Sequence, residues 1–227
     1  MITVVIPTLN AAPALGRTLA ALVPAAVEGL VKEVVIADGG STDGTASIAD
    51  AAGARLVATA PGRGGQLAAG ADEARGRWLL FLHADTVLEP GYIAEVAAFC
   101  RRTAPSEPKA AVFRFALDDD RFAARLLEFG VRFRTGVIGL PYGDQGLLIG
   151  ADAYRRLGGY KPLPLMEDVE LVRRLGRGAI TRFATRAVTS AERYRREGYG
   201  RRVARNITCL ALYFLGVAPR RIAEFYR

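Results

Sequence analysis

The chain has 227 residues, 51% of them hydrophobic, with a formal net charge of +8 and an isoelectric point near 9.9. This length and composition allow one domain with a substantial core, and they exclude a disordered chain. No apolar run reaches the roughly 20 residues of a membrane span, and the N-terminus has no basic signal-peptide region, so we expect a cytoplasmic protein. The positive charge favours nucleotide phosphates or an anionic membrane surface over nucleic acid, for which no binding pattern is present.

The two cysteines, Cys100 and Cys209, are far apart in the sequence. They are too few for a disulfide framework and too isolated for a zinc site. We therefore predict two buried, reduced thiols.

The first 82 residues alternate between strands and helices. Strands are predicted at 2–6, where Pro7 stops the first one, and at 34–37, 55–58 and 78–82. Helices are predicted between them: one capped by Asn10 and buried through Leu15, Leu19 and Leu22, one at about 44–52 closed by Gly53, and one around Leu67, Ala71 and Ala74. This order predicts right-handed βαβ units and a parallel sheet, so the fold class is α/β, and ligands are expected at the loops that begin at Pro7, Asp38, Ala60 and His83.

The remaining chain is less regular. We first predict a helix around Ile93, Val96, Ala97 and Cys100, a half-buried strand at 112–117, and a helix from Asp118 to about Arg134. An irregular glycine-rich stretch at 136–146 leads to a strand at 147–149 and a short helix at 152–157. The next helix begins at Glu167 with Val169, Val172 and Leu175 inside, and two short strands or an extended pair follow within 179–190. From Arg193 the chain is basic, and it is apolar from Ile207 to Ala218.

The stretch from Trp78 to Thr86 is the most informative. Five apolar residues without polar alternation are typical of a strand buried on both faces, and His83-Ala84-Asp85-Thr86 then follows at its carboxyl end. A carboxylate there is placed to hold a metal or a substrate. The alternative is that Asp85 and Thr86 only cap the next helix.

Two further polar clusters have a functional and a structural interpretation. The glycine-containing loop 38–45 can admit a nucleotide, with Asp38 accepting from a base or ribose, or it can be a plain turn capped by Thr42 or Asp43. Glu167 and Asp168 follow a proline-stiffened approach, but acidic residues also favour any helix start. We interpret the run from Asp118 to Asp120 as such a helix start.

Taken together, these motifs resemble the inverting GT-A glycosyltransferases of family 2. The similarity is carried, in the family's order and spacing, by 5–10, the loop 38–45, the glycine loop 62–66, the carboxylate at 85 and Glu167-Asp168. It extends to about residue 180 and implies a Rossmann-like, mixed but mostly parallel sheet flanked by helices, followed by a helical C-terminal segment. The combination of 81–86 with 142–146 looks more narrowly like a bacterial subgroup associated with radical-SAM and selenium- or arsenic-related genes.

The resemblance implies a role for each motif. Asp85 would hold Mn²⁺ or Mg²⁺ against the diphosphate of a UDP- or GDP-sugar, and Asp168 would be the general base, with Glu167 beside it. Pro7 and Asp38 would border the nucleoside. The other donor-binding positions implied are Thr8, Asn10, Gly40, Gly64 and Ala84.

Two departures limit the transfer of these roles. His83 replaces the first aspartate of the family's D-x-D motif, so the metal rests on Asp85 alone or includes the imidazole, which would favour Mn²⁺. The Q-x-x-R-W motif of the processive synthases is missing. We therefore expect a metal-dependent, hexosyltransferase-like enzyme that moves one sugar to an unidentified acceptor.

The expected organisation is a single domain over 1–227, with a nucleotide-binding half at 1–90, an acceptor half at 91–190 and a basic and apolar C-terminal segment at 191–227. The arginines of 193–227 would close over the diphosphate or bind anionic lipid at the inner membrane face, unless this segment only packs on the core. A homo-oligomer is compatible with the sequence. The alternative functions are a sugar-1-phosphate nucleotidyltransferase and a non-catalytic, nucleotide-sugar-binding or membrane-associated protein.

Overall fold

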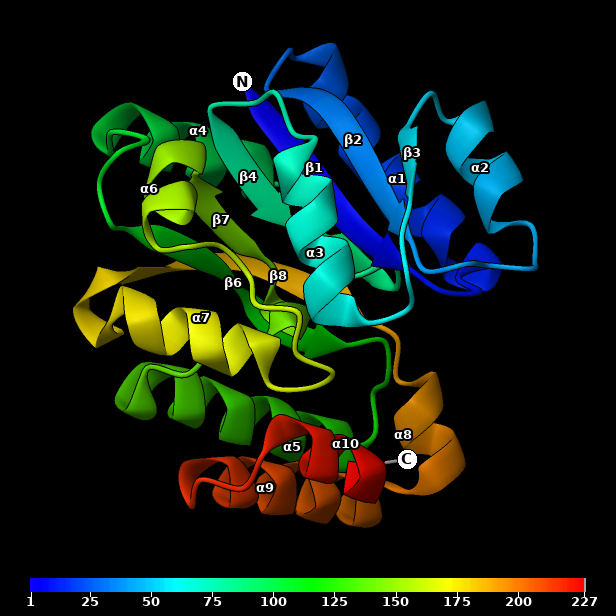
Figure 1. Cartoon of the computed structure of the whole chain (residues 1–227), viewed down its shortest axis with the longest axis vertical. Helices are drawn as coiled ribbons and strands as arrows, with labels where there is room; N and C mark the ends of the chain where they lie inside the picture. Colours follow the sequence, from blue (N-terminus) through cyan, green and yellow to red (C-terminus); the bar gives the residue numbers. More distant parts are fainter. Residues whose placement is uncertain (227) are drawn as a thin grey trace.

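The computed structural model describes residues 1–226, except for the side chains of Ile138 and Arg177. Arg227, the last residue of the expected C-terminal segment, lies outside the described residues. A single eight-stranded sheet with the order β3-β2-β1-β4-β7-β6-β8-β5 forms the centre of the molecule (Figure 1). The predicted α/β class is therefore confirmed.

The first four strands form a continuous parallel block of the sheet. They are β1 (Ile2–Thr8), β2 (Val31–Asp38), β3 (Arg55–Ala58) and β4 (Trp78–Phe81). β1 pairs in parallel with both β2 and β4, and all four residues of β4 are buried, as its unbroken apolar sequence predicts. The carboxyl ends of these strands therefore meet at one edge of the sheet.

Helices cover both faces of the sheet, which explains the near-continuous apolar strands. On one face, Ile2, Val4 and Ile6 of β1 pack with α1 (Ala12–Val27), α2 (Thr45–Ala51) and α4 (Tyr92–Arg102). On the other face, Val5 packs with α3 (Arg63–Asp72), α6 (Ala151–Arg156) and α7 (Glu167–Leu175). α3 and α7 approach each other at the edge where the loops gather (Figure 1).

Two local predictions in the first half are wrong. β1 does not stop at Pro7, because Pro7 pairs in register with Ala37 of β2. Proline has no backbone N–H, but the pairing of β1 with β4 already ends at Val5, so no hydrogen bond to β4 is lost. Asn10 does not cap α1, because its backbone is left-handed with φ 51°. Asp43 accepts from the Ala12 N–H at 3.0 Å instead, so a neighbouring loop caps the helix.

The second half differs more from the prediction. β6 (Ala110–Leu117) is buried except at Arg114, not half-buried, and β8 (Ile180–Thr189) is one strand rather than two. β5 (Thr86–Leu88) was not predicted, since three residues are too few to show a periodicity, and β7 (Leu147–Gly150) runs antiparallel to both of its neighbours. These long-range pairings make the sheet mixed.

The acidic run 118–120 precedes its helix instead of beginning it, because α5 spans Phe122–Phe133 and continues into the π-helical turn η1 (Arg134–Ile138). Its structural interpretation is nevertheless supported. Asp118 accepts from the Ala191 N–H at 2.5 Å, and Asp119 accepts from the Tyr199 hydroxyl at 2.9 Å. These bonds join the loop to the C-terminal segment.

That segment is helical, as predicted, and contains α8 (Glu192–Glu197), α9 (Tyr199–Phe214) and α10 (Pro219–Tyr226). α9 packs through Leu210 and Tyr213 against the cluster around Val169 and Val172 of α7. Both cysteines are free thiols, but only Cys209 is fully buried and Cys100 is half-buried. None of the helices in residues 1–226 has the length and apolar character of a membrane span.

Candidate functional site

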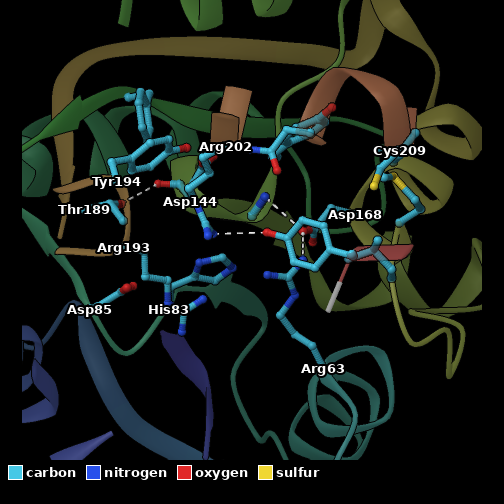
Figure 2. A pocket seen from close by; sticks show the side chains of 18 of the residues that line it. Arg63, His83, Asp85, Asp144, Asp168, Thr189, Arg193, Tyr194, Arg202 and Cys209 are labelled. Carbon is cyan, nitrogen blue, oxygen red and sulfur yellow. Dashed lines mark hydrogen bonds and ion pairs between the residues drawn. The ribbon is translucent and has the colours of Figure 1, made fainter. Parts of the chain in front are cut away.

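A cavity of about 150 Å³ lies beyond the carboxyl ends of β4 and β8. Its wall is built from the loop after β4, the turn η2 (Gly143–Gln145), the start of α7 and the C-terminal helices (Figure 2). The polar side chains that line it are Arg63, His83, Asp85, Tyr142, Asp144, Asp168, Thr189, Ser190, Arg193, Tyr194, Arg202, Asn206 and Tyr226. Acidic, basic and aromatic groups thus meet in one small volume.

His83 and Asp85 reach the cavity because the loop after β4 is fixed through its backbone. The hydroxyl of Thr18 donates to the carbonyl of Ala84 at 2.8 Å, and the Ser190 N–H donates to the carbonyl of Asp85 at 3.1 Å. Both bonds use backbone oxygens, so the two side chains stay free for a ligand. The predicted placement of His83 and Asp85 at a strand end is confirmed.

His83 is an uncharged imidazole at neutral pH. Burial lowers its pKa most, the Arg63 cation lowers it further, and the nearby Asp85 and Glu167 carboxylates only partly oppose this, so the pKa falls to about 4. Its Nε2 is buried without a hydrogen-bond partner. A neutral imidazole nitrogen that lacks a partner is a competent metal or hydrogen-bond ligand.

Asp168 enters the same cavity from the first turn of α7. Met166, which precedes the helix, has a left-handed backbone with φ 66°, and this sharp turn starts the helix at Glu167. The Asp168 carboxylate accepts from the Tyr160 hydroxyl at 3.1 Å and from the Gly143 N–H at 3.0 Å. These donors hold the carboxylate in one orientation.

Glu167 is fully buried and points to a different partner. One of its oxygens pairs with Arg63, which also lies 3.4 Å from Asp168, and its Oε2 has no partner. Burial raises the pKa of Glu167, although the positive charge of Arg63 opposes this. For Arg63, burial alone would lower the pKa, but the carboxylates of Glu167 and Asp168 outweigh it, so the pKa of Arg63 is raised. Arg63 therefore remains a cation that bridges the start of α3 and the start of α7.

Arg63 and Asp144 are cavity residues that the sequence interpretation did not select. Both lie in stretches that carry the family resemblance, the glycine loop 62–66 and the segment 142–146, but neither residue was given a role there. One oxygen of Asp144 is buried without a hydrogen-bond partner. Burial raises the pKa of Asp144 to about 6; the negative charges of Asp168 and Asp85 add to this effect, and the positive charge of Arg134 opposes it. Its neighbour Gln145 is anchored to the Phe113 carbonyl at 3.0 Å, which fixes the turn.

The predicted nucleoside residues form a separate cluster that does not line this cavity. Asp38 is buried and accepts from Thr8 at 2.7 Å, from the Ser41 N–H at 2.7 Å and from the Gly40 N–H at 3.1 Å. Burial alone would raise its pKa, but the hydrogen bonds from Ser41, Thr8 and Gly40 outweigh it and lower the pKa. Asp38 thus shapes the loop that follows β2. Pro7 lies near the end of the neighbouring strand β1, and Asn10 lies on the loop that follows it.

Gly64 and Ala84 contribute through the backbone. A Cβ at Gly64 would clash with the backbone of Lys161 and would lie 2.9 Å from the Leu163 nitrogen, so glycine allows the loop before α7 to approach α3. Ala84 fixes its loop through its carbonyl, as described above. Neither residue lines the cavity.

The C-terminal segment supplies two of its arginines to the cavity, Arg193 and Arg202. Arg202 is buried, pairs with Glu197 at 3.1 Å and donates to the Tyr226 hydroxyl at 3.1 Å. Figure 2 shows it opposite His83 and Arg63, across the cavity. Arg195 instead pairs with Asp118 and Asp119, and Arg205 with Glu197, so these two stabilise the segment itself.

The donor set fits a divalent ion that is shared with a ligand. Asp85 offers oxygen and His83 an unpartnered nitrogen, a combination suited to Mn²⁺. Across the described part of the chain, three or more His, Cys, Asp or Glu side chains do not converge on one point. A bound ion would therefore need further oxygens from a ligand such as a diphosphate.

Comparison with known proteins identifies a family and related glycosyltransferases. The model of glycosyl transferase family 2 matches residues 3–133, more than half of the chain. A PGL/p-HBAD biosynthesis glycosyltransferase of Mycobacterium tuberculosis H37Rv is 34% identical over an alignment of 169 residues, with 63% of this chain and 63% of that protein covered. The Mycobacterium bovis BCG protein of that name matches equally.

Solved structures share the fold. Glucosyl-3-phosphoglycerate synthase of Mycobacterium tuberculosis, in complex with Mn²⁺, UDP and phosphoglyceric acid, has a TM-score of 0.56 and 24% identity, covering 80% of this chain and 67% of that one. Staphylococcus aureus TarS 1–349 in complex with UDP-GlcNAc has a TM-score of 0.62 and 15% identity. The match covers 83% of this chain and 58% of the TarS chain. At these identities the likeness establishes the fold, which is GT-A.

The chain belongs to glycosyl transferase family 2. It spans 63% of the length of the curated relatives that it matches.

Proposed function

We propose that this protein is an inverting glycosyltransferase that moves one sugar from a UDP- or GDP-sugar to an acceptor hydroxyl. The observation that carries the proposal is the meeting of Asp85 and His83, from the end of β4, with Asp168, from the start of α7, in one cavity of a family 2 fold. Metal-side ligands and a carboxylate base are the two parts that the reaction needs.

On the donor side, Asp85 and His83 would hold Mn²⁺ or Mg²⁺, which would neutralise the charge of the leaving diphosphate. Arg193 lies in the same cavity and adds a positive charge for the phosphates. Pro7, near the end of β1, and Asp38, at the end of β2, would border the nucleoside. Thr8, Asn10, Gly40, Gly64 and Ala84 are the other donor-binding positions in this proposal.

On the acceptor side, Asp168 is the general base. It takes the proton of the acceptor hydroxyl while the acceptor oxygen bonds to the anomeric carbon, and the bond from that carbon to the phosphate oxygen breaks with its electron pair leaving on the diphosphate. Tyr160 and the Gly143 N–H orient the carboxylate. Glu167, held by Arg63, keeps the first turn of α7 in place.

Several finer features belong to this proposal. We infer a single domain over 1–227, with halves at 1–90 and 91–190 and a segment at 191–227. We also infer a cytoplasmic location. The narrower resemblance to the radical-SAM and selenium- or arsenic-associated subgroup stays a prediction. Structural neighbours carry UDP with Mn²⁺ or Mg²⁺ in their complexes, which supports a metal-dependent UDP-sugar as the first donor to test.

The test is a donor screen followed by a base variant. UDP-, GDP- and dTDP-sugars are added with Mn²⁺, and the donor that raises the melting temperature most is then followed for transfer of its sugar to water, with the anomer of the released sugar recorded by NMR. Asp168→Asn should keep the thermal shift and lose turnover about 100-fold or more.

Asp152→Asn, an exposed change on α6, is the matched control and should behave as wild type. Wild-type turnover in Asp168→Asn would remove the base assignment. Retention of the donor's anomeric configuration in the first product would overturn inversion, and the absence of any nucleotide-sugar thermal shift would overturn the proposed function.

A further inference from the structure

Helix α5 has a solvent-exposed apolar stripe. Phe122, Leu126, Phe129 and Phe133 follow one another at spacings of four, three and four residues, which places them on one face of the helix. Between 57% and 82% of each of these side chains is exposed. The opposite face packs through Ala124 and Val131 onto β6, so this stripe is not part of the core.

The neighbouring C-terminal helices are also apolar on the outside. α9 packs beside α5, and the two helices lie with α10 at the end of the molecule away from β1 to β3 (Figure 1). Ile207, Phe214 and Leu215 are at least half exposed at α9, and Phe225 is 55% exposed on α10. Large exposed apolar side chains gathered on neighbouring elements indicate an interaction surface.

The charge of this end of the molecule is positive. Across 121–133 and 199–226, five arginines are exposed and Glu224 is the single exposed acid; the arginines are Arg121, Arg132, Arg201, Arg220 and Arg221. α9 contains no acidic residue, and of its three arginines Arg201 is exposed, whereas Arg202 and Arg205 pair with Glu197. Amphipathic helices with aromatic residues on one side and arginines beside them are suited to the interface of an anionic bilayer.

We propose that the exposed face of α5, α9 and α10 docks on an anionic membrane surface, with the apolar stripe in the interface and the arginines at the lipid headgroups. A second copy of the chain is the weaker occupant. In a two-fold dimer the same patch faces itself, so the exposed arginines of both copies would be brought together.

This surface is separate from the cavity but shares a helix with it. Arg202, Asn206 and Cys209 of α9 line the cavity, whereas Ile207 and Phe214 of the same helix are exposed. A docked protein would hold the cavity about one helix diameter, roughly 10 Å, from the bilayer surface. The docking itself does not depend on the proposed transfer reaction.

Co-sedimentation with vesicles tests the proposal. The full chain is mixed with vesicles of phosphatidylcholine alone and with vesicles in which about one third of the lipid is phosphatidylglycerol. We expect binding to the anionic vesicles at least about tenfold stronger than to the neutral ones, and weaker binding in high salt. No bound protein on the anionic vesicles would overturn the proposal.

Two double variants distinguish binding through this face from nonspecific binding through any exposed apolar side chains. Phe129→Ser with Phe133→Ser should lower the vesicle partition coefficient about tenfold or more, since two aromatic side chains leave the interface. The matched control is Val23→Ser with Val27→Ser on α1, also exposed and distant from α5 in Figure 1, which should bind as wild type. Equal loss in both pairs would contradict the assignment.

Light scattering on the same proteins decides between the membrane and a second copy. If wild type is a dimer that Phe129→Ser with Phe133→Ser converts to a monomer, and neither protein binds vesicles, the face is a dimer interface and the proposal is wrong. Both variant pairs should keep the nucleotide-sugar thermal shift, so a failure of docking is distinguishable from a failure of the proposed function.

Discussion

The carboxylates near the cavity differ in how many donors they already have. Asp38 and Asp168 each accept several hydrogen bonds from the protein, whereas Asp144 and Glu167 each have one buried oxygen without a partner. A carboxylate whose oxygens already accept hydrogen bonds is held in one orientation. A buried oxygen without a donor can still bind a proton, a water molecule or a ligand. Asp168 is thus the oriented group, and Asp144 is the group most sensitive to pH.

Asp144 makes the free energy of unfolding depend on pH. Its pKa is raised from 3.8 to about 6 in the folded protein, so the folded state retains a proton that the unfolded chain has lost. The stabilisation is complete below pH 3.8 and disappears as the pH rises through 6. In chelator, Asp144→Asn should therefore raise the unfolding free energy at pH 8 by about 1–3 kcal/mol.

Urea unfolding at about pH 4.5 and pH 8 measures this difference. The exposed Asp152→Asn on α6 is the control and should follow wild type at both pH values. A wild-type pH dependence in Asp144→Asn would show that the group does not titrate as described.

At the scale of elements, α3 has two adjacent glycines with opposite surroundings. A Cβ at Gly64 would lie 2.9 Å from the Leu163 nitrogen, whereas a Cβ at Gly65 would have no atom within 4 Å. Gly64→Ala should lower the unfolding free energy by about 1–3 kcal/mol, because the loop before α7 must move. Gly65→Ala should be neutral or stabilise the helix by up to about 1 kcal/mol.

Thermal unfolding of the two variants tests the close approach of α3 and the loop 161–163. Since that loop leads to Glu167 and Asp168, Gly64→Ala should also slow turnover, and Gly65→Ala should not. Equal stability of the two variants would contradict the packing.

Local sequence patterns predicted those strands and helices whose apolar residues alone show the pattern of the element. β4 is a run of apolar residues and α7 has inward residues at helical spacing, and both lie where expected. β5 and the single strand β8 depend on pairing between segments about 100 residues apart, which no local pattern records. The capping of α1 by Asp43 was missed for the same reason.

At the scale of the whole molecule, the cavity is closed by a segment that the motifs did not include. The order of strands placed His83 and Asp85 at one edge, and the family resemblance added Asp168. Arg63, Asp144 and Arg202 come together with them only through the packing of α3, η2 and α9. The C-terminal arginines were predicted to act as one group. In the fold they divide among the cavity, internal ion pairs and the exposed face.

We propose that the cavity beyond β4 binds the diphosphate of the donor together with a divalent ion. Calorimetric titration of UDP into wild type and Asp85→Asn, each with Mn²⁺ and with chelator, tests it most directly. We expect Mn²⁺ to tighten UDP binding to wild type by about tenfold or more and to have little effect on Asp85→Asn. Mn²⁺-independent UDP affinity in wild type, or an unchanged Mn²⁺ effect in Asp85→Asn, would contradict the account.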